Sequence, residues 1–65
     1  MTLKDFLTEE RGRYGDLAEH LGVSISLVSM WTTGTRLIPI KHIRAIHTWT
    51  GKRVTLRDIR PDIYG

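Results

Sequence analysis

The chain has 65 residues, of which 40% are apolar and 26% are charged, so it can build one small hydrophobic core but not two domains. It contains no cysteine, which excludes disulfide crosslinks and cysteine-based zinc sites and favours a reducing, cytoplasmic location. No apolar run approaches the roughly 18 residues of a membrane span, and the first residues are too charged for a signal peptide. We therefore expect one soluble domain over residues 1–65, without membrane association.

The net charge of +3 is distributed unevenly along the chain. Residues 1–19 contain five carboxylates and three basic side chains, and residues 58–65 sum to −1. Between them, residues 20–57 contain six basic side chains and no carboxylate. A long acid-free stretch gives one side of a small domain a positive field, which favours a polyanionic partner. A solvated basic surface without a ligand explains the charge equally well.

Glycine residues divide the chain into short helical segments. Thr2 is placed to cap a first helix that ends near Glu10, with apolar residues at Leu3, Phe6 and Leu7. A second helix is predicted from about residue 14 to residue 21, where a glycine stops it. A third is predicted from a serine cap at residue 24 to a glycine at residue 34.

A fourth helix is predicted with Pro39 in its first turn and an inner stripe of Ile40, Ile43 and Ile46. The last segment is ambiguous, because residues 54–57 alternate like a strand while Thr55 also suits the cap of one helical turn that ends before a proline. We favour the helical turn over the strand. The expected fold class is therefore all-α, with five short helices.

The second and third predicted helices share a specific set of apolar and small residues. A steep crossing needs a small side chain at the closest approach, which Ala18 provides, and a left-handed position in the turn, which Gly22 provides. Val23 fills the corner of the turn, and four larger residues close the core from both helices: Leu17, Leu21, Val28 and Trp31. This set resembles the helix-turn-helix unit of repressors, over about residues 14–33.

The resemblance extends beyond this unit. The chain is similar to small phage Cro-type or YdaS-type regulators, whose DNA-binding domain is lambda-repressor-like, in the segments Trp31-Thr-Thr-Gly34, Arg36-Leu-Ile-Pro39, Ile46, Thr50-Gly51, Val54-Thr55 and Arg60-Pro61-Asp62. The resemblance implies a compact helical domain that represses transcription at operator DNA, with no cofactor and no catalytic residue. Spacing and charge alone imply only a helical domain that binds nucleic acid.

Docking of a helix-turn-helix places the outward residues of the third helix against the base edges of the major groove. The predicted base-contacting residues are Ser24, Ser26, Ser29, Met30 and Thr33. Ile25 suits either a thymine methyl or the protein core. The face carries no Arg, Lys, Gln or Asn for a bidentate base contact, so we expect indirect readout or water bridges to add specificity. The predicted phosphate contacts are Arg13, Tyr14, Arg36 and Lys41, with Lys52 and Arg53 as weaker candidates.

Other chemistry finds little support in the sequence. His42 and His47 do not share a helical face, so we expect no metal site. The serines lack a neighbouring histidine and carboxylate, no phosphate-binding glycine loop exists, and the chain is too short for a substrate pocket, so we expect no enzyme. Trp31 and Trp49 fall on inward faces, which argues against a base-stacking platform for single strands.

A homodimer is expected at least on DNA, because one domain covers only a half-site. Its candidate contacts are Trp49, Ile59, Ile63 and Tyr64, for which burial in the protomer core is an equal alternative. Two other functions stay open: an antitoxin-type regulator that binds a toxin-like protein partner, and a non-specific nucleic-acid binder associated with a bacterial nucleoid. A small toxic protein encoded nearby would favour the first, and equal affinity for operator and scrambled DNA would favour the second.

Overall fold

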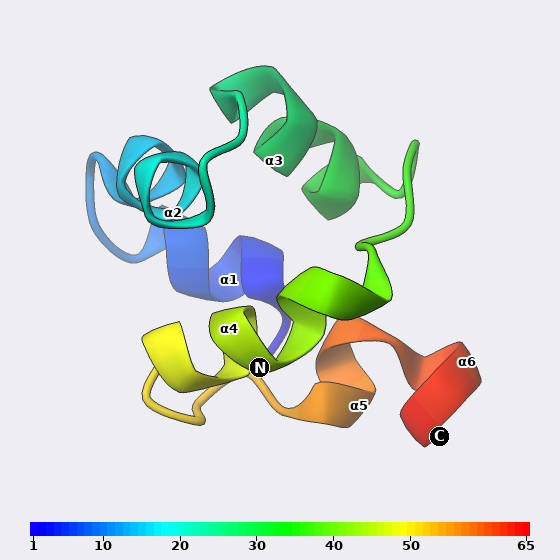
Figure 1. Ribbon diagram of the computed structural model, residues 1–65. Helices are drawn as coiled ribbons and strands as arrows, with labels where there is room; N and C mark the ends of the chain where they lie inside the picture. Colours follow the sequence, from blue (N-terminus) through cyan, green and yellow to red (C-terminus); the bar gives the residue numbers. More distant parts are fainter.

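The computed structural model describes all residues 1–65 and contains six helices and no strand. In chain order these are α1 (Leu3–Thr8), α2 (Arg13–Leu21), α3 (Ile25–Thr33), α4 (Ile40–Trp49), α5 (Leu56–Ile59) and α6 (Pro61–Tyr64). Figure 1 shows α3 at one end of the domain, α4, α5 and α6 at the other, and α1 and α2 alongside the core between them. The all-α prediction is confirmed, with one helix more than expected.

Side-chain caps begin three of the helices, as predicted. The hydroxyls of Thr2 and Ser24 each accept a hydrogen bond from the amide three residues later, both at 3.1 Å. At α5 the cap is reciprocal: Thr55 Oγ1 accepts from the Asp58 amide, and the Asp58 carboxylate accepts from the Thr55 amide. These bonds and a helical backbone over 56–59 rule out the alternative of a strand.

Three boundaries differ from prediction. The first helix ends at Thr8 rather than near Glu10. Pro39 lies before α4 with extended backbone (φ −60°, ψ 145°) instead of in its first turn. Pro61 begins α6 instead of ending the last helix, because its fixed φ and missing amide suit the first position of a new turn.

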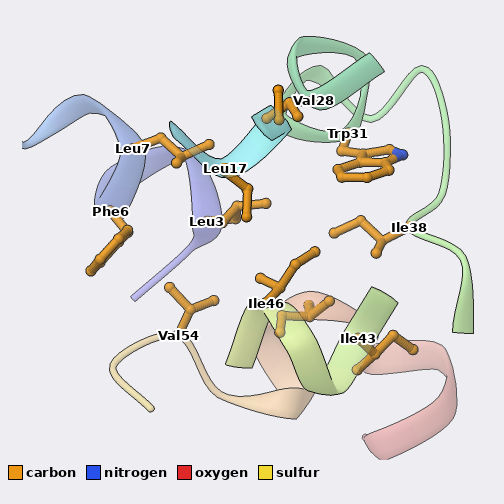
Figure 2. Packing of buried hydrophobic residues seen from close by; sticks show 12 residues of the cluster. Leu3, Phe6, Leu7, Leu17, Val28, Trp31, Ile38, Ile43, Ile46 and Val54 are labelled. Atoms are coloured by element: carbon orange, nitrogen blue, oxygen red, sulfur yellow. The ribbon is translucent and has the colours of Figure 1, made fainter. Parts of the chain in front are cut away.

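The core collects apolar residues from every helix except α6. Leu17, Val28, Ile43, Ile46 and Val54 are fully buried, and Figure 2 shows these side chains on several elements around one shared interior. Trp31 is also buried, and Trp49 is half-buried with its ring 5.5 Å from the Phe6 ring in an edge contact. The inward placement of both tryptophans is therefore confirmed.

The predicted apolar stripe of α4 is wrong for one of its three residues. Ile40 is 70% exposed, whereas Ile43 and Ile46 are fully buried. Ile40 is the first residue of α4, directly after the extended Pro39, and its side chain is turned away from the core. The spacing of the three isoleucines could not reveal where along its length α4 leaves the core.

Candidate nucleic-acid interface

Backbone geometry sets the turn between α2 and α3. Gly22 has a left-handed backbone (φ 71°), and its amide donates to the Glu19 carbonyl at 3.2 Å. The Val23 amide donates to the Ala18 carbonyl at 2.9 Å, which completes the helix end. Ala18 is buried at the crossing. A short turn closed in this way leaves α3 with one face on the core and one face in solvent.

The outward face of α3 carries the predicted base-contacting residues, of which Ser24, Ser26, Ser29 and Thr33 are exposed. Met30 is half-buried and contributes only part of its side chain to this face.

The hydroxyls on this face differ in what they already bind. Ser24 Oγ is occupied as the helix cap, and Thr33 Oγ1 donates to the Met30 carbonyl at 3.2 Å and lies 3.0 Å from Thr35 Oγ1. Ser26 and Ser29 make no side-chain hydrogen bond within the domain. They are one helical turn apart and therefore present two free hydroxyls side by side.

Tyr14 and Arg13 begin α2 but lie in different surroundings. Tyr14 is half-buried, and its hydroxyl donates to Thr32 Oγ1 at 3.4 Å, so it connects α2 to α3. The Arg13 guanidinium is turned toward α1 instead. It donates to the Phe6 carbonyl at 2.7 Å and lies 4.1 Å above the Phe6 ring.

Two carboxylates complete the surroundings of Arg13, at 3.1 Å from Glu9 and 2.6 Å from Glu10. The side chain is only 18% exposed. A phosphate contact from Arg13 would require it to leave these partners, so the structure does not place Arg13 with the free cations. The sequence alone could not predict these contacts of Arg13, because they depend on how α1 and the turn before α2 fold against each other.

Arg53 is also paired with a carboxylate of the same region. Its guanidinium makes two hydrogen bonds to Glu9, at 2.9 and 2.7 Å, across 44 positions of sequence. The hydrogen bond from Arg53, and then the one from Arg13, lower the pKa of the Glu9 carboxyl below its usual value. Two of the predicted cations therefore stabilise the junction of α1 with the rest of the fold.

Arg36 and Lys41 are exposed and form no ion pair. The Arg36 amide donates to the Met30 carbonyl at 3.2 Å, which holds the loop after α3 against the end of that helix. Arg44 is equally exposed and unpaired, one turn after Lys41 on α4. It was not among the predicted phosphate contacts, although the acid-free charge run includes it.

The three histidines do not gather into a metal-like cluster with carboxylates. His42 packs beside Trp31, with ring centroids 5.9 Å apart. Burial, and to a lesser extent the neighbouring Lys41, lowers the pKa of His42. His20 lies 6.5 Å from the ring of Trp49 on another side of the core.

Two helices joined by a tight glycine turn, with the second helix exposed along one face, define a small helix-turn-helix domain. The chain belongs to the YdaS family, because the family model described as bacterial toxin YdaS matches residues 6–65. No curated protein and no solved structure matches the chain. The YdaS part of the predicted resemblance is thus confirmed, and the Cro-type part stays an interpretation. None of the six helices is long and apolar enough to span a bilayer.

Proposed function

We propose that this protein is a sequence-specific DNA-binding regulator that represses transcription by covering a promoter, with α3 in the major groove. The observation that carries the proposal is the exposed, acid-free face of α3, followed along the chain by three exposed cations without ion pairs: Arg36 in the loop after α3, and Lys41 and Arg44 on α4. Carboxylates elsewhere neutralise Arg13, Arg53 and Arg60. Free positive charge on the segment that follows α3 is what contact with a phosphate backbone requires.

Base contacts are assigned first to Ser26 and Ser29, because their hydroxyls are free to donate to or accept from several base edges. Thr33 and Met30 add methyl-rich surface farther along α3. Ser24 has its side-chain oxygen occupied by the cap and acts mainly by holding the start of the helix. The regulator acts by occupying DNA, with no cofactor and no catalytic step.

A homodimer on DNA fits the dimensions of the domain. Half-sites of such operators lie about 34 Å apart, one helical turn, and the longest extent of the protomer is 29 Å. Two touching copies therefore span adjacent half-sites.

The residues proposed for the dimer contact are Ile63 and Tyr64, which are 44% and 38% exposed, together with Leu37 and Ile40. Arg60 links the two segments by donating to the Ile38 carbonyl at 2.7 Å. Ile59, the other candidate near the end of the chain, is buried in the protomer core and is left out.

The family's description as a bacterial toxin is compatible with a repressor that harms the host by silencing genes. Induced expression tests this directly: the wild type should slow bacterial growth, and an Arg36→Ala, Lys41→Ala variant should not. Growth inhibition that persists in a variant that has lost DNA binding would instead favour a protein partner as the target.

The specific test compares two hydroxyl deletions on different helices, one on α3 and one on α1. Ser26→Ala should change the preference between the best-bound duplex and a scrambled duplex. Thr8→Ala removes an exposed hydroxyl on α1, away from every proposed DNA contact, and should leave both affinities unchanged. Equal effects of the two substitutions on both duplexes would contradict the proposed docking of α3.

A further inference from the structure

We propose that Ile25 recognises the 5-methyl group of thymine in the operator, as a specificity-determining contact at the start of α3. The inference rests on the proposed function and concerns a residue that lies outside the serine and threonine set. Ile25 is the first residue of α3 and is 57% exposed. Residues at the N-terminal end of the second helix of such a motif lie nearest to the base edges.

The Ile25 side chain packs against the rest of the protein on one side only. Its Cδ1 atom lies 3.7 Å from the position that a Cβ on Gly15 would occupy, so the inner edge of Ile25 rests over the first turns of α2. Isoleucine is stiff at χ1, and its outer surface stays open to solvent. The result is a fixed apolar surface that projects from the reading end of the motif.

The major groove of DNA presents one group that matches this apolar surface. Thymine's methyl is the apolar group that base edges present in the major groove, while the other positions are hydrogen-bond donors and acceptors. The reading face of α3 carries no Arg, Lys, Asn or Gln. An exposed isoleucine there has no polar function to offer, and contact with a methyl removes apolar surface from water on both partners.

Charge favours a polyanion as the occupant of this surface. Residues 20–57 contain no carboxylate, and Arg36, Lys41 and Arg44 follow α3 without ion pairs, so a partner that covers α3 also meets a segment of net positive charge. DNA satisfies both requirements at once, with phosphates beside the cations and a methyl beside Ile25. The test of this proposal must therefore also be able to detect a protein that binds at Ile25.

The test uses duplexes selected for tight binding, in which each thymine of the half-site is replaced in turn by uracil, a change that removes only the methyl group. For the wild type, replacing the recognised thymine by uracil in one half-site should raise the Kd about fourfold, which corresponds to the free energy of burying one apolar carbon. Ile25→Ala removes the contact from both protomers, so it should bind the unmodified duplex about 16-fold more weakly and should show no difference between thymine and uracil at that position.

Ile25→Val is the matched control, because it keeps a stiff, β-branched apolar side chain at the start of α3. It should keep the thymine preference, and circular dichroism should show all variants folded. Thymine preference that survives in Ile25→Ala at every position would overturn the inference and leave the proposed function intact. Failure to select any preferred duplex would overturn both, and binding of a protein at Ile25 would replace the DNA contact.

Discussion

Arg36→Ala provides the sharpest test of where DNA lies on the domain. Arg36 is exposed and unpaired, so its removal should change the folding free energy by less than about 0.5 kcal/mol. If Arg36, Lys41 and Arg44 each contact one phosphate in both protomers, the dimer makes about six contacts, and the slope of log K against log salt is about −5.4. The variant retains about four contacts, with a slope of about −3.6.

These slopes correspond to large differences in a simple titration. Between 50 and 200 mM salt the wild type should lose about 2,000-fold in affinity, and Arg36→Ala only about 150-fold. Fluorescence anisotropy with a labelled duplex measures both. Arg57→Ala is the control, because Arg57 is also exposed and unpaired but belongs to α5, at the opposite end of the domain from α3 (Figure 1). Equal slope changes for Arg36→Ala and Arg57→Ala would refute the docking and leave only an effect of net charge.

Three further predictions concern the framework that holds α3. Ser24→Ala removes the α3 cap and should cost about 1 kcal/mol, seen as a melting temperature lower by about 4–8 °C, whereas Ser26→Ala, which breaks no internal hydrogen bond, should melt like the wild type; equal melting of both would contradict a role for the cap. Gly22→Ala should cost about 1–2 kcal/mol by denaturant unfolding, because φ is 71° while no atom lies within 4 Å of the added Cβ, so an unchanged midpoint would argue against the left-handed turn. The lowered pKa of His42 means that the unfolded chain binds the proton more readily, so the unfolding free energy should fall as pH drops below about 6.5, and His42→Gln should flatten this fall. A fall of the same size in the variant would show that another group is responsible.

Local signals in the sequence predicted most of the secondary structure. The caps at Thr2, Ser24 and Thr55 depend on residues three positions apart, and Gly22 and Gly34 end helices through their own backbone freedom. Such features are determined within one turn of chain, which is why a single sequence reveals them.

What the sequence missed depends on long-range contacts. Arg13 and Arg53 look like free cations until α1 places Glu9 between them. Ile40 fits a helical stripe until the crossing of α4 leaves its first residue outside the core. For the candidate site, the outward face of α3 followed from the helix period, while the choice among its hydroxyls required knowing which ones the fold already uses.

The central claim is sequence-specific recognition by α3, and selection of bound sequences from random duplex DNA tests it most directly. The selected duplex and a scrambled control are then compared at physiological salt. We expect an inverted repeat with half-sites about one helical turn apart, bound at least about a thousandfold more tightly than the control. No enriched sequence, with affinity that follows salt alone, would contradict the claim and indicate a non-specific nucleic-acid binder.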